Sequence, residues 1–408
     1  MGDYEEYKRW EEKVRKEVFQ FSQLLCTTVS LSGKEGAMAG ILASKMEELG
    51  YDEVWTDKIG NVIGLIRGKK KGRTFMFNSH LDHVDPGEEA NWSHDPYGGE
   101  IVDGYLYGRG ASDVKGGMGP QIYAGAFLKE RREAWGGCFV FTGVVLEEQA
   151  ESLGMRVLCR DTLPEKGIRC DGVIINEATA LNLSLGHRGR VEFELETFGK
   201  TSHGSAPWLG INAIYKMVPI LARIRDIGQF PEDPIFGRPS LSPTIISCSP
   251  GRLSIIPDRC TVSLDHRYLP SEGVDPMAKR IKKILEEEKD KEPEFRGHVQ
   301  IREVEEVSYT GYRERVKKMM PPFLLSKDHP LLLKAEGALR GLGESPRHIL
   351  WYFNTDGGCT ATEFHIPTLG YSPGEEIYAH VPDERISLDF ISRSISGNAA
   401  IAYELMKD

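Results

Sequence analysis

Two short segments of this chain are apolar at nearly every position, and helical stretches lie between such segments. They are Gly137–Val145 and Gly172–Ile175, and the small-residue stretch Gly116–Lys129 before the first has the character of a helix. A strand that is apolar throughout is buried on both faces, whereas a strand with one wet face alternates. The pattern therefore predicts an α/β domain with a mostly parallel sheet sandwiched by helices.

The rest of the first half fits this domain. Helical periodicity predicts one helix over residues 3–26 and another from Gly36 to Leu49, which ends at Gly50. Short strands are expected at 52–55, 61–66 and 74–78. The basic stretch Arg67–Arg73 contains two glycines, so we expect a solvated hairpin turn there.

The character of the sequence changes after about Ser184. Arg190–Thr197 and Thr261–Tyr268 alternate like strands with one exposed face, and helices are expected at 212–226 and 276–289. From about Pro330 the buried character returns, with a strand at 368–371 and a final helix at 387–406. We therefore predict a catalytic domain formed by residues 1–184 and 306–408, interrupted by an inserted α+β domain at 185–305.

Composition and charge exclude several classes of protein. Acidic residues number 61 against 51 basic ones, a balance that argues against a nucleic-acid partner. No apolar run approaches the length needed to cross a bilayer, so we expect no membrane partner either. The cysteines are scattered and never form a CxxC pair, which favours a reducing cytoplasm over a disulfide scaffold or a thiolate zinc site. They are Cys26, Cys138, Cys159, Cys170, Cys248, Cys260 and Cys359.

Polar side chains follow the predicted buried strands. His80 and Asp82 are two residues apart after the strand at 74–78, which places both on one side of an extended chain. Glu147 and Glu148 follow Gly137–Val145, and adjacent carboxylates can serve one site only where a strand is ending. A hydrogen-bonded core pair at 80 and 82, or surface charge at 147 and 148, are the alternatives.

Three further positions extend the pattern. Asp113 lies between glycines directly before a helix, either at a sheet edge or as a helix cap. Glu177 follows the strand at 172–175, and His380 follows the turn at 372–375. Strand ends at one edge of an open α/β sheet form its ligand site. Two histidines with several carboxylates suit two borderline divalent ions such as zinc, cobalt or manganese.

The sequence resembles the co-catalytic dizinc aminoacylase/carboxypeptidase family, which includes acetylornithine deacetylase, succinyl-diaminopimelate desuccinylase and glutamate carboxypeptidase. The resemblance runs from about Gly33 to the C-terminus. There is also some resemblance to a subgroup of hydrolases linked to selenium metabolism. The most specific segments are SHLDHVDPG, WSHDPYGG, GRGASDVKGG, LEEQAESLG, GHRGR, GKTSHGSAP, GINAI, IIPD, LDHRYLP and AHVPDE.

The resemblance implies a role for each of these positions. Asp113 would bridge two metal ions, His80 and Glu177 would complete the first site, and Glu148 and His380 the second. Asp82 would orient His80. Glu147 would be the general base that activates water and then protonates the leaving amine. A cis peptide bond after the bridging aspartate is also implied.

The inserted domain matches the family's lid and dimerisation domain, which implies a homodimer. His203 matches a histidine that reaches the partner subunit's active site and polarises the scissile carbonyl. Arg267 matches an arginine that contacts a substrate carboxylate. One position departs from the family, because Ser254 stands where many members have an asparagine that helps to bind substrate.

We therefore predict a cytoplasmic, zinc-dependent amidohydrolase or metallopeptidase. Its substrate would be a small molecule with an amide and a carboxylate, such as an N-acyl amino acid or a dipeptide, and the sequence does not separate a deacylase from a dipeptidase. A metallo-β-lactamase motif fails because Asn78 occupies its first histidine position. His83 is then expected in a pocket wall. The alternative is a catalytically silent member that acts in binding or assembly.

Overall fold

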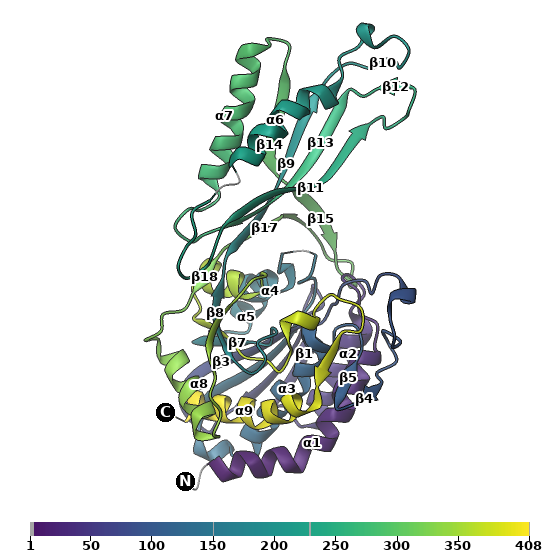
Figure 1. Ribbon diagram of the computed structural model, residues 1–408. Coiled ribbons are helices and arrows are strands. Elements are labelled where there is room, and N and C mark those ends of the chain that lie inside the picture. Colours follow the sequence, from purple (N-terminus) through teal and green to yellow (C-terminus); the bar gives the residue numbers. More distant parts are fainter. Residues whose placement is uncertain (1–3, 150, 228–229, 408) are drawn as a thin grey trace. The chain divides into compact units, whose positions relative to one another are not determined.

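The computed structural model describes residues 4–149, 151–227 and 230–407, which form two compact units (Figure 1). Unit 1 comprises Met1–His187, Glu305–Glu314 and Phe323–Asp408, and unit 2 comprises Arg188–Val304 and Arg315–Pro322. The segment Arg315–Pro322 thus groups with unit 2, although it lies beyond residue 305. The predicted domain boundaries at 184/185 and 305/306 stay a prediction.

Unit 1 contains a mixed sheet whose central strands are parallel. The order is β1-β2-β6-β3-β7-β20-β8-β18, with β19 paired to β8, and β6, β3, β7 and β20 run parallel to one another. The strands are β1 (Glu53–Thr56), β2 (Val62–Arg67), β3 (Lys70–His80), β6 (Gly136–Val144), β7 (Gly172–Ile175), β8 (Leu183–His187), β18 (Phe323–Leu324), β19 (His348–Trp351) and β20 (Thr368–Gly370). A smaller sheet contains β4 (Ile101–Val102), β5 (Tyr105–Tyr107) and β21 (Arg385–Ser387).

Helices flank this sheet, so the predicted α/β class is confirmed. They are α1 (Tyr4–Thr27), α2 (Gly36–Glu48), α3 (Gly116–Glu130), α4 (Leu153–Val157), α5 (Leu163–Glu165), α8 (Pro330–Gly341) and α9 (Leu388–Met406). Helices α1, α3 and α8 each pack against α9, and α2 contacts β1 and β2. Side-chain caps stabilise the N-termini of two of these helices. His329 accepts the backbone N–H of Leu331 ahead of α8, and Ser387 accepts that of Phe390 ahead of α9.

One expectation about the sheet is wrong. The stretch Arg67–Arg73 does not form a hairpin turn, because β6 lies between β2 and β3 and pairs with both. The last four residues of that stretch already belong to β3. Two apolar strands close in sequence resemble a hairpin, but a central strand supplied by residues 136–144 buries both of them more completely.

Unit 2 is a sheet with helices on one face. The order is β11-β13-β9-β14, with β17 paired to β9. Residues alternate between buried and half-exposed along β9 and β13, and helices α6 and α7 cover the buried face. The elements are β9 (Gly189–Phe198), β10 (Ser202–His203), α6 (Ala213–Ile227), β11 (Ser240–Ser249), β12 (Ile255–Ile256), β13 (Arg259–Tyr268), α7 (Asp275–Lys291), β14 (Arg296–Ile301) and β17 (Met319–Met320). Strands β15 (Glu303–Val307) and β16 (Arg313–Lys317) pair with each other.

Among the described residues, no helix is long and apolar enough to span a bilayer. All seven cysteines are free thiols, and Cys248 is the one that is not fully buried.

Candidate metal centre

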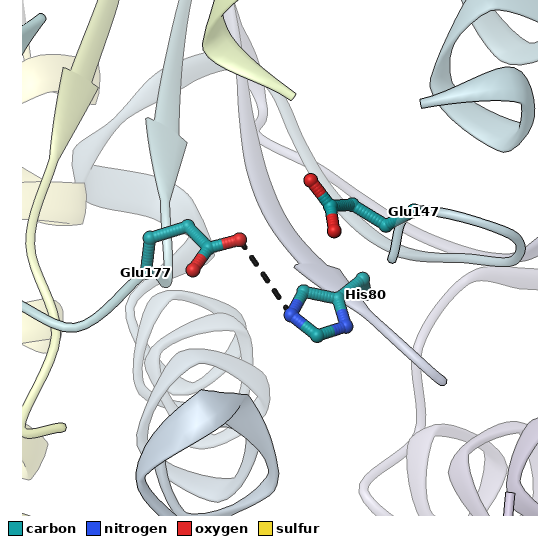
Figure 2. A group of neighbouring side chains, drawn as sticks. All are labelled: His80, Glu147 and Glu177. Atoms are coloured by element: carbon teal, nitrogen blue, oxygen red, sulfur yellow. Dashed lines mark ion pairs between the residues drawn. The ribbon is translucent and has the colours of Figure 1, made fainter. Parts of the chain in front are cut away.

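Three parallel strands of unit 1 deliver their polar residues to one edge of the sheet. His80 is the last residue of β3, Glu147 follows the end of β6, and Glu177 follows the end of β7. Since β6, β3 and β7 are adjacent and parallel, their carboxyl ends coincide. Figure 2 shows the carboxylates of Glu147 and Glu177 directed towards the His80 ring.

The chain turns sharply after β6, and this turn lets two adjacent glutamates serve one site. Leu146 has a φ of 56°, in the left-handed region. The backbone N–H groups of Glu147 and Glu148 then donate to the two carboxylate oxygens of Asp82, at 3.2 and 3.1 Å. Both glutamate side chains are thereby fixed beside His80 by a buried aspartate.

Asp113 lies between the two histidines. Its Oδ1 atom is 3.0 Å from His80 Nε2, and its Oδ2 atom is 3.1 Å from His380 Nε2. His380 Nε2 is also 3.2 Å from Glu148 Oε1, and His80 Nε2 is 3.5 Å from Glu177 Oε1. Each oxygen of one carboxylate thus faces a different histidine, which in turn faces a different glutamate.

The backbone at Asp113 is held in place by a buried glutamate. The Asp113–Val114 peptide bond is cis, as the resemblance implies. Glu384 is fully buried, and its Oε1 atom accepts the backbone N–H groups of Ser112 and Asp113 at 3.0 and 3.1 Å. Its Oε2 atom accepts Arg109 Nη1 at 2.6 Å. A buried ion pair therefore anchors the turn that carries the central carboxylate.

The hydrogen bonds of His80 prepare its other nitrogen for a metal. Nδ1–H donates to the backbone carbonyl of Asp82 at 2.9 Å, while the Asp82 carboxylate is 3.6 Å from Nδ1. A neutral ring held in this way presents its Nε2 lone pair to the carboxylates, as metal-ligating histidines do. The role of Asp82 in orienting His80 stays a prediction, and the observed contact is made by its carbonyl oxygen.

The residues present fit divalent ions such as zinc. Ligand atoms of His80, Glu147 and Glu177 lie within 4.8 Å of one another, and so do those of His80, Asp113 and Glu148. Imidazole nitrogen and carboxylate oxygen are the donors that borderline divalent ions accept. Five buried or nearly buried carboxylates around one histidine pair would repel one another strongly without cations.

The pKa values of these groups are shifted because the carboxyl and imidazole groups are buried close together. Burial raises the pKa of the Glu147 and Glu177 carboxyls well above the usual value, and nearby carboxylates add to the effect. Burial alone would also raise the pKa of Asp113, but hydrogen bonds from His380 and His80 hold it below the usual range. Hydrogen bonds to Asp113 and Glu148 raise the pKa of His380 to about 11. Carboxylate and imidazole groups in this cluster therefore influence one another's pKa strongly.

His83 is occupied on both ring nitrogens. The backbone N–H of Ser30 donates to its Nε2 atom at 3.0 Å, and its Nδ1–H donates to the carbonyl of Val84 at 2.8 Å. Burial lowers its pKa to about 4. A neutral ring with both nitrogens used in hydrogen bonds is a structural residue, and its place in a pocket wall stays a prediction.

The two predicted substrate-binding residues belong to unit 2. His203 is exposed on β10, and its Nδ1 atom accepts the backbone N–H and the hydroxyl of Ser205 at 3.1 and 2.7 Å. Those donors leave the proton of a neutral ring on Nε2. The Arg267 guanidinium contacts the Asp265 carboxylate at 2.7 and 3.3 Å. An incoming carboxylate would have to share this arginine with Asp265.

Sequence reasoning missed three buried acids that interact electrostatically with residues of the centre. Asp356, 1% exposed, accepts Asn78 Nδ2 at 2.7 Å, and burial raises its pKa. Glu35 accepts the backbone N–H groups of Gly33 and Leu146. The third is Glu384, which lies inside the segment AHVPDE. None of them directly follows an apolar strand, and that position was the pattern by which the other acids were predicted.

Similarity to known proteins shows the family to which this chain belongs. Residues 185–293 match the model of the M20 peptidase dimerisation domain. The protein YgeY of Escherichia coli strain K12 is 32% identical over 347 residues, which cover 84% of this chain and 83% of that protein. The chain belongs to the M20 metallopeptidase family.

Other M20 relatives agree in sequence and in fold. Succinyl-diaminopimelate desuccinylase of Paracoccus denitrificans is 25% identical over 269 residues, covering 64% of this chain and 70% of the relative. The structure of human carnosine dipeptidase 1 superimposes with a TM-score of 0.75 and 18% identity, and 99% of each chain is covered. An M20 chain of this kind is a metal-dependent hydrolase with a central catalytic sheet and a dimerisation domain.

Proposed function

We propose that this protein hydrolyses the amide bond of an N-acyl amino acid or a dipeptide at a centre of two divalent ions, preferably zinc. The observation that carries the proposal is the position of Asp113, whose two carboxylate oxygens lie 3.0 and 3.1 Å from the Nε2 atoms of His80 and His380. One carboxylate placed between two imidazoles is the arrangement that a bridging ligand requires.

Residues on both sides of Asp113 complete two sites. We assign the first site to His80, Asp113 and Glu177, and the second to Asp113, Glu148 and His380. Two divalent ions bound there would acidify a water molecule and polarise the scissile carbonyl. Both tasks match the chemistry of amide cleavage, which needs a strong nucleophile and a stabilised oxyanion.

Glu147 is the general base in this proposal. Its carboxylate is close to His80 and is directed towards the ring (Figure 2). Burial raises its pKa well above the usual value, which is the direction that makes a carboxylate a stronger proton acceptor. Glu147 can therefore take a proton from the attacking water and pass it to the leaving amine nitrogen.

His203 supplies the remaining donor, by analogy with the family. Ser205 fixes the proton of the neutral ring on Nε2, so this atom can donate to the carbonyl oxygen of the substrate. We propose that it acts on substrate bound in the partner subunit of a homodimer. Mixing His203→Ala and Glu147→Gln proteins should then restore activity in hybrid dimers. No recovery after verified subunit exchange would contradict this assignment.

The nature of the leaving group is open to direct test. The desuccinylase relatives favour an acyl group on an amino acid, and the carnosine dipeptidase fold favours a dipeptide, so both classes belong in one screen. Purified protein is incubated with each compound and with zinc, cobalt or manganese, and amine release is measured. Turnover that needs metal supports the proposal. No turnover of either class by the metal-loaded protein would contradict it.

We retain the enzyme over the catalytically silent alternative because the proposed ligands and the proposed base of unit 1 are all present and lie close together. The free thiols support the proposal that the protein works in the cytoplasm.

A further inference from the structure

Two cysteines of unit 2 lie directly opposite each other on neighbouring antiparallel strands. Cys248 on β11 pairs with Cys260 on β13. Directly opposed residues project to the same face of a sheet, and here that face is the buried one. Cys260 is fully buried in the core beneath α6 and α7, and Cys248 packs partly buried against the same core.

The backbone shows which kind of pair this is. Glu192 on β9 donates its N–H to the carbonyl of Lys318 and accepts the N–H of Arg302, both at 2.9 Å, so it directs its backbone polar groups away from β13. Thr197 lies five residues further along β9 and therefore faces β13, where Cys260 is the directly opposed residue and bonds to it. The pairing of Cys260 with its partner on β11 is therefore the non-hydrogen-bonded type.

Non-hydrogen-bonded pairs bring the two strands closest together. Their Cα atoms are about 4.5 Å apart, against about 5.5 Å in hydrogen-bonded pairs. A disulfide bridges Cα atoms that are roughly 4.4–6.8 Å apart, so this position lies within its range. Cys248 also contributes to the raised pKa of the Cys260 thiol, in agreement with two neighbouring side chains.

We propose that Cys248 and Cys260 are a modification site, at which a low-molecular-weight disulfide converts the two thiols into a reversible cross-strand disulfide. The Cys248 sulfur attacks the small disulfide, forms a mixed disulfide and expels one small thiol. The Cys260 sulfur then attacks the Cys248 sulfur and expels the second. Two cysteine thiols are oxidised, one small disulfide is reduced to two thiols, and both cysteine protons end on the expelled thiols.

The order of the two steps follows from burial. Burial raises the pKa of Cys260 to about 12, so this thiol is a poor initial nucleophile. Cys248 is half-buried and is the thiol that solvent can reach. The remaining cysteines are fully buried and serve as internal controls.

The position of the bridge connects it to β10, which carries His203. A loop connects the end of β11 at Ser249 to the start of β13 at Arg259. Strand β12 lies within this loop and pairs with Ser202 and His203. The backbone N–H of Gly204 also donates to the carbonyl of Ser254 at 2.7 Å. A bond between Cys248 and Cys260 would tie together both ends of the loop that holds this histidine.

The test is peptide mapping of the intact protein without reductant after incubation with oxidised glutathione. We expect one peptide pair linked through Cys248 and Cys260, the loss of both thiols to alkylation, and full reversal by dithiothreitol. Persistent glutathione on Cys248, a bond between chains or unchanged thiols would each overturn the proposal. In the Cys248→Ser variant, Cys260 should stay a free thiol. Modification of Cys260 in this variant would overturn the proposed order of attack.

A second measurement tests the link to the loop and needs no catalytic activity. Hydrogen exchange is compared between the reduced and the oxidised protein, with Cys248→Ser under the same oxidant as the control. We expect slower exchange of the amides in residues 250–258 in the oxidised wild type alone. Equal exchange in both forms would overturn the coupling of the bridge to the His203 segment.

Discussion

The Nε2 atom of His80 and the Oδ1 atom of Asp113 lie 3.0 Å apart, although 33 positions separate these residues in the chain. His80 ends a central strand, and Asp113 belongs to a turn that Glu384 anchors from the C-terminal part of the chain. The centre therefore depends on segments from both halves of unit 1. Substitutions at the ligands, at the base and at the anchor should have separable effects.

The first prediction concerns Glu147. Glu147→Gln removes the group that accepts a proton but leaves both sets of metal ligands intact. We expect kcat to fall by about 10²–10⁴-fold with unchanged metal content, as for loss of a general base. The exposed Glu165→Gln, the same chemical change on α5, is the matched control. Retention of full activity by Glu147→Gln would show that another group moves the proton.

The second prediction concerns Glu384, which contacts no substrate and acts through Asp113. Glu384→Gln weakens the hold on two backbone N–H groups and leaves Arg109 without its counter-charge. We expect zinc affinity to fall by about 10–100-fold, the range found for residues that support ligands. The zinc dissociation constant is measured by competition with a chromophoric chelator, at a temperature well below the unfolding transition. An unchanged dissociation constant would mean that Asp113 keeps its position without this anchor.

The sequence predicted the elements that carry the centre, but not what supports it. Apolar strands that end in acids are a strong local signal, so Glu147 and Glu177 could be found without a structure. Asp356 and Glu384 are buried by segments distant in sequence, and no local pattern marks them. Strand β11 was also missed, because Pro243 and an irregular register at 243–245 break its alternation. The hairpin turn predicted at 67–73 was wrong for the same reason. The strand that pairs with both β2 and β3 is β6, which lies more than 60 residues further along the chain than the start of β3.

The third prediction is a pH dependence that arises at Glu35. Burial, with Asp82 nearby, raises the pKa of Glu35 from 4.5 to about 7. The folded protein therefore keeps this proton to a higher pH than the unfolded chain. The stability that this group contributes is fully present below about pH 4.5 and is lost as the pH rises through about 7.

Glu35→Gln mimics the protonated form at every pH. We expect the variant to be more stable than the wild type by up to roughly 3 kcal/mol at pH 8.5, and about equal to it near pH 4.5. Urea unfolding of the metal-free proteins at both pH values gives the difference. A stability difference that does not grow with pH would refute the assignment.

The fourth prediction concerns the dimer. Strand β11 is an edge of the unit 2 sheet, and Ile246 on it is 59% exposed. An apolar residue on an open edge invites pairing with another strand. We expect Ile246→Asp to shift the protein from dimer to monomer in light scattering after size exclusion. Leu333→Asp on α8, a similar change at an exposed residue of unit 1, should leave the dimer intact. A dimeric Ile246→Asp protein would place the interface elsewhere.

The measurement that tests the central claim most directly is metal content by mass spectrometry, combined with activity after chelation. We expect two divalent ions per chain, loss of activity with a chelator and recovery with zinc or cobalt. Asp113→Asn should lose both ions, while Glu177→Gln should keep the second. Freshly purified wild-type protein without stoichiometric metal, whose activity survives chelation, would contradict the account.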